Sequence, residues 1–255
     1  MRYRLVVGLM TLSACGPIVD RSLRPDTGAA MPVGGLDPHR TVALSAFLED
    51  RGAAIDAVQI VQDGEVVFSY GAVEAASNLA SARKSVLSLL YGIAIDRGAI
   101  DPDATLAELG IDEARTPLTA QERTANVRQL LQSRSGIYLP ADAKSGDAAE
   151  RRPPRGENHP GEAFHYNNWG FNVLGAIFEQ ETGLEIGAAF QMWIAEPTGM
   201  QDFHPSHIFF DDGATASDYP AYRIFLSARD LARLGVLVAE GGRWQGCQIV
   251  PAAWI

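Results

Sequence analysis

Lysine is scarce in this chain of 255 residues. Lysine and arginine together number 21, and only Lys84 and Lys144 of these are lysines. Acidic residues number 31, so the formal net charge is −10. Because nucleic-acid binding depends on clustered cations, this balance argues against a nucleic-acid partner. Hydrophobic residues make up 47% and charged residues 20% of the chain, which is typical of a globular domain and not of a disordered chain.

Long apolar runs are also lacking, and the short run near the N-terminus indicates export. Residues 5–12 are mostly apolar, follow a basic start, and are too few to span a bilayer as a helix. Residues 12–16 read Leu-Ser-Ala-Cys-Gly, which resembles a bacterial lipobox, in which the cysteine is acylated and becomes the new N-terminus. We therefore predict a signal peptide over 1–14 and a lipid on Cys15. A plain secretory signal with a chance cysteine is the alternative.

Cysteine is nearly absent, and the two cysteines allow at most one disulfide. If Cys15 carries a lipid, Cys247 has no partner, so we expect no disulfide despite export. Residues 15–36 are rich in breakers and lack apolar periodicity, which predicts a tether before a domain over 37–255. The expected location is the periplasmic side of the bacterial cell envelope, with membrane contact through the lipid only.

Apolar periodicity predicts a β-hairpin followed by a long helical region. Residues 57–61 and 65–70 flank Asp63-Gly64, a pair that supplies the positive φ angles of a tight hairpin turn. The polar stretch 141–162 is predicted to be a functional or mobile loop. Apolar residues at helical spacing predict helices at 42–48, at 86–93 with Gly98 closing the helix, at 127–131, at 173–178, and after the capping residue Ser227.

The first candidate for chemistry is the pair Ser81 and Lys84 at the start of the strongest predicted helix. Residues three apart lie on one face of a helical turn. A helix N-terminus stabilises developing negative charge and leaves backbone N–H groups free for an oxyanion. A desolvated lysine can lose its proton and act as a base. The alternative is a serine that only caps the helix beside a solvated lysine.

The second candidate is Tyr166-Asn167-Asn168, followed by an apolar helix. A tyrosine near a lysine can shuttle protons if the cation lowers its pKa. An asparagine two residues later can donate to a substrate carbonyl and accept from the lysine. An ordinary turn is the alternative, because Tyr and Asn are common in turns.

Together these residues carry a resemblance to the penicillin-recognising serine hydrolases, which include class C β-lactamases, D-Ala-D-Ala peptidases and related esterases and amide hydrolases. Beside Ser81-x-x-Lys84 and Tyr166-x-Asn168, four framing stretches are similar to those of the family, with Ser133 in place of the usual histidine. These stretches are Leu-Leu-Gln-Ser-Arg-Ser-Gly at 130–136, Glu-Pro-Thr-Gly-Met at 196–200, Ser-Ala-Arg-Asp-Leu-Ala-Arg-Leu-Gly at 227–235, and 244–254.

The resemblance implies an α+β fold of the β-lactamase/transpeptidase type, with an antiparallel sheet and a large helical region. It also implies that Ser81 attacks a carbonyl and forms an acyl-enzyme, that Lys84 and Tyr166 share the proton transfers, and that Asn168 orients the substrate and holds Lys84. The Ser81 backbone N–H would form half of the oxyanion hole. The expected substrate is a small ester, β-lactam or amide, with no cofactor and no metal.

The family's third motif, a Lys-Thr-Gly or His-x-Gly on a strand, is not found after Tyr166. We therefore expect a chain that lacks the C-terminal sheet strands and is incomplete at its C-terminus; a natural short form is the alternative. An open hairpin edge predicts low stability and weak or absent catalysis for these 255 residues. Two other functions are kept open: a non-catalytic envelope binding protein on the same fold, and a metal-dependent hydrolase using His204 and His207.

Overall fold

The computed structural model of this chain describes residues 37–51, 54–142, 152–213 and 216–255. The predicted signal peptide and tether, Cys15 among them, therefore lie outside the described residues. The predicted loop over 141–162 is described in part, and that part contains neither helix nor strand.

Helices account for most of the regular structure. Short 3-10 turns lie beside several of them, and a π-helical turn joins two of them. The helical segments are α1 (Pro38–Arg51), η2 (Ala80–Ala82), α2 (Arg83–Asp96), η3 (Glu122–Thr124), α3 (Val127–Leu131), α4 (Asn168–Thr182), α5 (Ile186–Phe190), η5 (Gln191–Ala195), α6 (Glu196–Thr198), η6 (Pro205–His207) and α7 (Ala228–Ala239).

The strands of the described residues form three small antiparallel sheets. The middle sheet has the order β3-β5-β4, and the other two are hairpins. The strands are β1 (Ala57–Gln62) with β2 (Glu65–Gly71), β3 (Ser77–Asn78), β4 (Ile208–Phe210) and β5 (Tyr222–Leu226) in the middle sheet, and β6 (Arg243–Trp244) with β7 (Cys247–Gln248).

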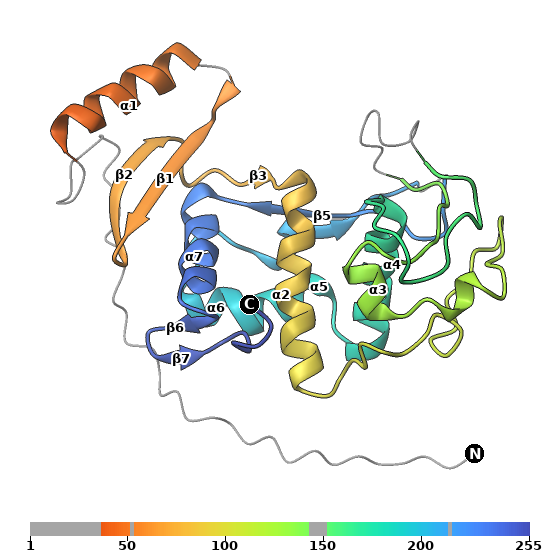
Figure 1. The fold of residues 1–255 in the computed structure, drawn as a ribbon. Helices are drawn as coiled ribbons and strands as arrows, with labels where there is room; N and C mark the ends of the chain where they lie inside the picture. Colours follow the sequence, from red (N-terminus) through yellow and green to blue (C-terminus); the bar gives the residue numbers. More distant parts are fainter. Residues whose placement is uncertain (1–36, 52–53, 143–151, 214–215) are drawn as a thin grey trace.

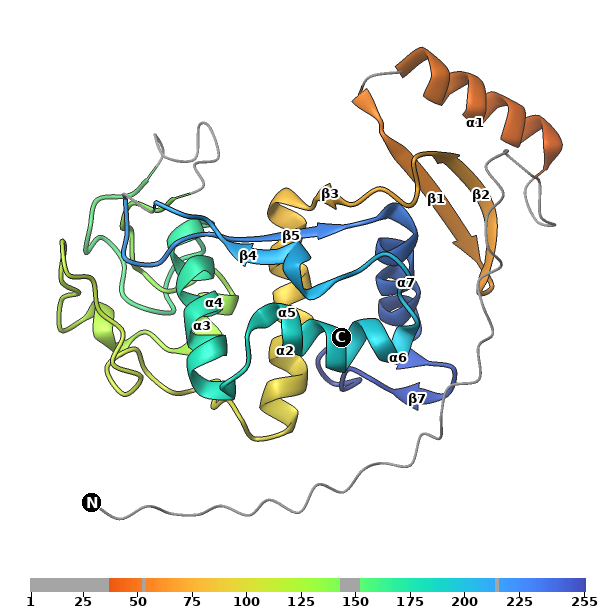
Figure 2. The ribbon, with the colours of Figure 1, turned by 180° about the vertical axis from the view of Figure 1, so that it is seen from behind.

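Helix α2 crosses the β3-β5-β4 sheet at the centre of the molecule (Figure 1). Viewed from behind, the sheet lies in front of α2, with α3 and α4 on one side and α7 on the other (Figure 2). The β1–β2 hairpin and α1 lie beyond α7. The core is apolar and joins α2, α4 and the sheet; its fully buried side chains include Leu87, Leu90, Trp169, Leu174 and Ile224.

The predicted elements agree with this fold, and the predicted α+β class is confirmed. The hairpin turn has φ angles of 52° at Asp63 and 78° at Gly64, as the tight turn requires. Gly98 follows the C-cap of α2 with φ 69°. The side chain of Ser227 accepts a hydrogen bond from the Asp230 N–H and so caps α7.

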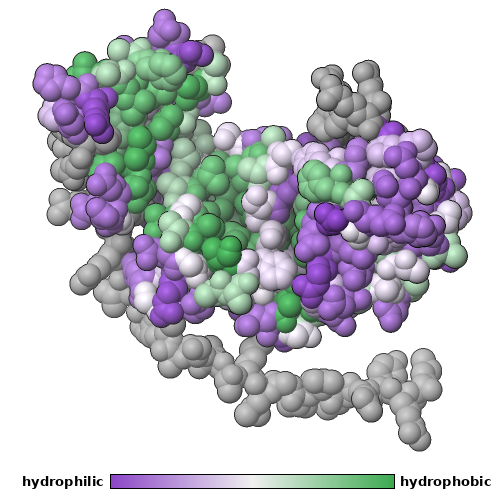
Figure 3. All heavy atoms as spheres, viewed as in Figure 1, coloured by the Kyte–Doolittle hydropathy of each residue, from purple (hydrophilic) through white to green (hydrophobic). Residues whose placement is uncertain are grey.

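The β1–β2 hairpin carries apolar side chains on the face seen in Figure 3. Its two strands pair only with each other among the described strands. On α1 beside it, Val42 and Phe47 are exposed. The apolar side chains of the hairpin are half-buried or buried. The unpaired strand edges agree with the expected open edge, and the low stability drawn from that edge stays a prediction.

One expectation about cysteine is contradicted. Cys247 at the start of β7 is disulfide-bonded in this structure. The prediction that Cys247 has no partner is therefore wrong for this structure. That prediction rested on the assumption that Cys15 carries a lipid, and no local sequence pattern around Cys247 indicated whether it forms a disulfide.

Candidate active site

A sharp turn presents Ser81 at the end of the middle sheet. Strand β3 pairs with β5 up to Asn78, and the Ala80 N–H donates to the Asn78 side chain at 2.9 Å. Ala80 has φ 46°, a conformation that residues other than glycine rarely adopt. Such strained residues cluster at functional sites. The next residue, Ser81, is exposed on η2, directly before α2.

Lys84 and Tyr166 lie against the Ser81 hydroxyl. The Lys84 Nζ donates to the Tyr166 hydroxyl at 2.5 Å and lies 3.4 Å from the Ser81 Oγ. The Tyr166 hydroxyl donates to the Ser81 Oγ at 2.8 Å. The structure therefore joins three predicted residues, separated by up to 85 positions in sequence, in one hydrogen-bonded chain.

Neither alternative reading of Ser81 and Lys84 fits the structure. The N-cap of α2 is Ala82, and neither η2 nor α2 has a side-chain cap, so Ser81 is not a capping residue. Lys84 is only 7% exposed and is therefore not a solvated lysine. Its ammonium group also lies 4.6 Å from the centre of the Tyr166 ring and 5.3 Å from that of Phe171.

The surroundings lower the pKa values of both Lys84 and Tyr166. Burial is the main cause for Lys84, because it disfavours the charged amine, and the positive charge of Arg83 adds to it; the hydrogen bond to Tyr166 acts in the opposite direction. For Tyr166, burial alone would raise the pKa, but hydrogen bonds with Lys84 and Ser81 and the charges of Lys84 and Arg83 together lower it. Both changes favour loss of a proton from the pair.

Tyr166 is positioned by the segment that resembles the family at 130–136. The Ser133 carbonyl accepts from the His165 N–H at 2.8 Å, and Arg134 binds the carbonyls of Gly161 and Glu162 at 3.0 and 2.9 Å. This segment therefore fixes the backbone directly before Tyr166.

Asn167 fixes the backbone on the other side of Tyr166. Its side chain accepts from the Gly170 N–H at 2.8 Å as the N-cap of α4 and donates to the Ile137 carbonyl at 3.1 Å. We did not select Asn167 from the sequence, although an asparagine directly before an apolar helix is a capping signal.

Asn168 is half-buried at the first position of α4. The Lys84 Nζ donates hydrogen bonds to Tyr166 and Ser81. The expected roles of Asn168, toward Lys84 and toward a substrate, stay predictions.

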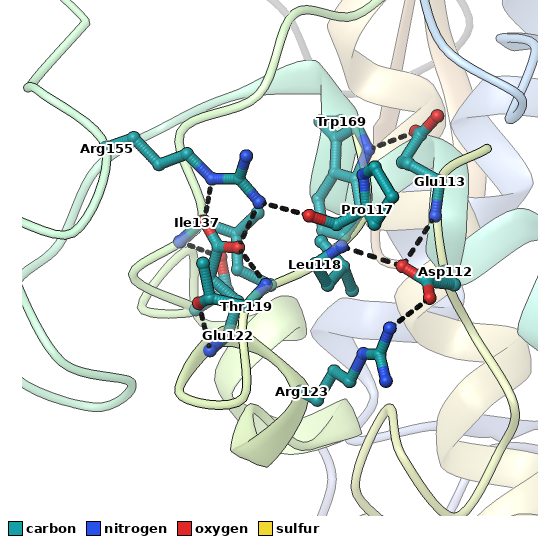
Figure 4. Close-up of polar contacts among 11 residues, drawn as sticks. Asp112, Glu113, Pro117, Leu118, Thr119, Glu122, Arg123, Ile137, Arg155 and Trp169 are labelled. Atoms are coloured by element: carbon teal, nitrogen blue, oxygen red, sulfur yellow. Dashed lines mark hydrogen bonds and ion pairs between the residues drawn. The ribbon is translucent and has the colours of Figure 1, made fainter. Parts of the chain in front are cut away.

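A second residue missed in the sequence is Glu113, a buried carboxylate behind the site. It accepts hydrogen bonds from the Trp169 indole at 2.6 Å, from the Asp218 N–H at 3.0 Å and from the Ser217 hydroxyl. Figure 4 shows the bond to Trp169, the residue after Asn168. The neighbouring Asp112 accepts from the backbone of its own loop (Figure 4). Glu113 thereby connects the start of α4 to two loops.

The remaining framing stretches are hydrogen-bonded to each other or to α2. The buried Asp230 of α7 accepts from the N–H groups of Gln201 and Asp202 at 2.9 and 3.0 Å, and Arg233 donates to the Thr198 carbonyl at 2.7 Å. The Trp254 indole donates to the Ser88 carbonyl of α2 at 2.8 Å. These matches therefore mark packing around α2, the helix that follows Ser81.

The histidines considered for a metal site serve a local turn. His204 caps η6, and its Nδ1 lies 2.8 Å from the Ser206 hydroxyl. In the part of the chain that the structure describes, no group of three His, Cys, Asp or Glu residues is arranged to hold a metal ion. No helix there combines the length and the apolar character needed to cross a membrane.

Comparison with known proteins places this geometry in a class. Residues 43–246 match the family described as β-lactamase, and the chain belongs to that family. Among curated proteins, no sequence matches. The match establishes the family and the β-lactamase-type fold of this chain.

Several solved structures of other proteins have the same fold. A candidate β-lactamase from Bacteroides dorei is 21% identical, with a TM-score of 0.60, over 86% of this chain and 68% of its own. A candidate 6-aminohexanoate-dimer hydrolase from Bacillus anthracis is 20% identical, with a TM-score of 0.58, over 82% and 60%. An octameric penicillin-binding protein homologue from Pyrococcus abyssi is 18% identical, with a TM-score of 0.59, over 86% and 59%. This chain therefore spans roughly three fifths to two thirds of the length of these proteins.

Proposed function

We propose that the protein is a serine hydrolase that acts through an acyl-enzyme on Ser81, with a small β-lactam, amide or ester as substrate. The observation that carries the proposal is the hydrogen-bonded chain from Lys84 through Tyr166 to an exposed Ser81. An exposed hydroxyl can reach a substrate carbonyl, while a buried amine behind it can hold the proton that the hydroxyl must lose.

The reaction divides into two acyl transfers. In the first, the Ser81 O–H bond breaks, its proton passes to the Lys84–Tyr166 pair, and the Ser81 Oγ bonds to the substrate carbonyl carbon. The bond from this carbon to the leaving nitrogen or oxygen then breaks, and the pair returns the proton to the leaving group. The carbonyl oxygen, negative in between, would accept from the Ser81 backbone N–H.

In the second transfer, water replaces Ser81. The pair takes a proton from the water as its oxygen bonds to the acyl carbon, and it returns a proton to the Ser81 Oγ as the ester breaks. Hydroxyl hydrogens rotate, so the 2.8 Å separation of the two oxygens allows transfer between Ser81 and Tyr166 in either direction. Asn168 at the start of α4 would hydrogen-bond the substrate amide or ester.

The relatives favour the lactam and amide classes. They are a candidate β-lactamase, a candidate 6-aminohexanoate-dimer hydrolase and a penicillin-binding protein homologue. The test is turnover of nitrocefin beside p-nitrophenyl esters and small amides. We expect Ser81→Ala to abolish every turnover that the protein shows, whereas Ser85→Ala, an exposed serine on the same helix, keeps it. Equal turnover by the Ser81→Ala variant would refute the proposal.

Export and lipid anchoring at the bacterial cell envelope belong to the same proposal and rest on the residues around Cys15. A thioether to lipid consumes the thiol of Cys15, so the lipid and a disulfide of Cys247 within one chain exclude each other. The intact mass of the mature protein from the membrane fraction distinguishes the lipid on Cys15 from the disulfide of Cys247. A lipid mass lost in Cys15→Ala supports the anchor, and an unlipidated, oxidised chain contradicts it.

A further inference from the structure

Arg83 is a buried cation directly before Lys84 in the chain. Its side chain is 2% exposed, its Nη2 donates to the Asn172 Oδ1 at 3.1 Å, and its guanidinium carbon lies 4.1 Å from the centre of the Tyr222 ring. Asn172 and Tyr222 are themselves fully buried. Both partners are neutral, and no ion pair joins Arg83 to a carboxylate within the described residues.

Burying such a charge is costly unless it is paired. Buried arginines in proteins usually meet a carboxylate. In this chain even the more exposed Arg155 does so, with Glu122. The guanidinium of Arg83 is therefore buried without an ion pair to a described carboxylate. This arrangement needs an explanation beyond packing, because an apolar side chain of similar size would fill the space at lower cost.

The explanation lies in the neighbours of this charge. Arg83 precedes Lys84 on α2, and the Lys84 ammonium binds the Tyr166 hydroxyl. The ring of Tyr222, on β5, lies against the guanidinium of Arg83. The positive charge of Arg83 lowers the pKa of Lys84 and the pKa of Tyr166. No described carboxylate is among the groups that shift either one.

We infer that Arg83 is a positioning residue of the proposed site, whose unpaired charge, held by Asn172 and Tyr222, keeps the Lys84–Tyr166 pair one proton short and ready to accept the proton of Ser81. The inference rests on the proposed function. It does not depend on which member of the pair lacks the proton, because a nearby cation disfavours an ammonium and favours a phenolate alike. The two groups then titrate as one pair.

The test measures the rate at which a fluorophosphonate labels Ser81, as a function of pH. Labelling requires the deprotonated pair, so the rate rises with pH along an acidic limb. In Arg83→Gln we expect this limb to move to higher pH. At acidic pH the labelling rate should fall about tenfold relative to wild type, and at alkaline pH it should return to the wild-type rate. Arg83→Lys, which keeps the charge, should keep the limb near its original position.

A matched control is available on the same helix. The guanidinium of Arg97 lies 4.5 Å from the centre of the Trp193 ring at the other end of α2, and Arg97→Gln should leave the limb unchanged. A loss of rate in Arg83→Gln that is equal at every pH would show a merely structural role and overturn the inference. An Arg83→Lys limb that moves as far as the Gln limb would overturn it too.

A second variant approaches the charge from its partner, in case Arg83→Gln does not fold. Asn172→Asp places a carboxylate where the amide oxygen now accepts from Arg83, and it should move the limb to higher pH. A folded Asn172→Asp with an unchanged limb refutes the inference. If the wild-type protein shows no labelling of Ser81, the proposed function itself fails. If the wild-type protein is labelled and the acidic limb lies at the same pH in these variants, only the role of Arg83 fails.

Discussion

Glu113 offers the sharpest test of how the site is held together. In Glu113→Ala, the Trp169 indole and the Ser217 hydroxyl lose their acceptor, and both residues are buried, at 0% and 4% exposure. A buried donor left without a partner costs about 1–3 kcal/mol. We therefore expect the free energy of unfolding to fall by about 2–6 kcal/mol, a large part of the total of about 5–15 kcal/mol that is typical of a domain.

The assay is urea unfolding followed by tryptophan fluorescence, together with the Ser81 labelling rate under native conditions. Labelling should slow in Glu113→Ala even where the protein is folded. Trp169 directly follows Asn168 in the first turn of α4, so loss of its hydrogen bond to Glu113 loosens the start of that helix beside Tyr166. The control is Glu108→Ala, which removes an exposed carboxylate that accepts two hydrogen bonds from Thr105. It should lower the free energy of unfolding much less than Glu113→Ala does. Equal losses in the two variants would refute this reasoning.

Three further outcomes are expected. Lys84→Met removes the buried amine and should slow Ser81 labelling about 10²- to 10⁴-fold, and Tyr166→Phe should do so to a similar or smaller extent, in the same labelling assay; wild-type rates would contradict the proton path. Gly92→Ala places a methyl group 2.4 Å from a ring carbon of Trp254 and should cost about 1–3 kcal/mol in urea unfolding. Gly235→Ala on α7 meets no neighbour within 4 Å and should instead add about 0.5–1 kcal/mol; destabilisation by both would contradict the packing.

Local patterns predicted much of the fold because they act over a few residues. The turn at Asp63-Gly64 needs only its own φ angles, and Ser227 caps α7 through a bond to the third residue onward. The predicted site residues Ser81, Lys84 and Tyr166 do meet in the structure. Their meeting could not be derived from spacing, because Tyr166 reaches Lys84 through long-range packing of α4 on α2.

The two charged residues that were missed, Arg83 and Glu113, differ in what the sequence could have shown. Arg83 lies three residues before Val86 and seven before Leu90, so the apolar stripe of α2 extends to it and marks it as buried. Glu113 lies in an irregular loop whose partners come from distant segments, and no local pattern distinguishes it from an exposed acid.

The central claim is that Ser81 is the nucleophile and that its proton passes to Lys84 and Tyr166. Peptide mass analysis after incubation with a fluorophosphonate measures this directly. The account predicts one label per chain, located on Ser81, absent in Ser81→Ala, strongly reduced in Lys84→Met and unchanged in Ser85→Ala. A label distributed over several serines, or one on Ser81 that appears equally fast in unfolded protein or in Lys84→Met, would contradict the account.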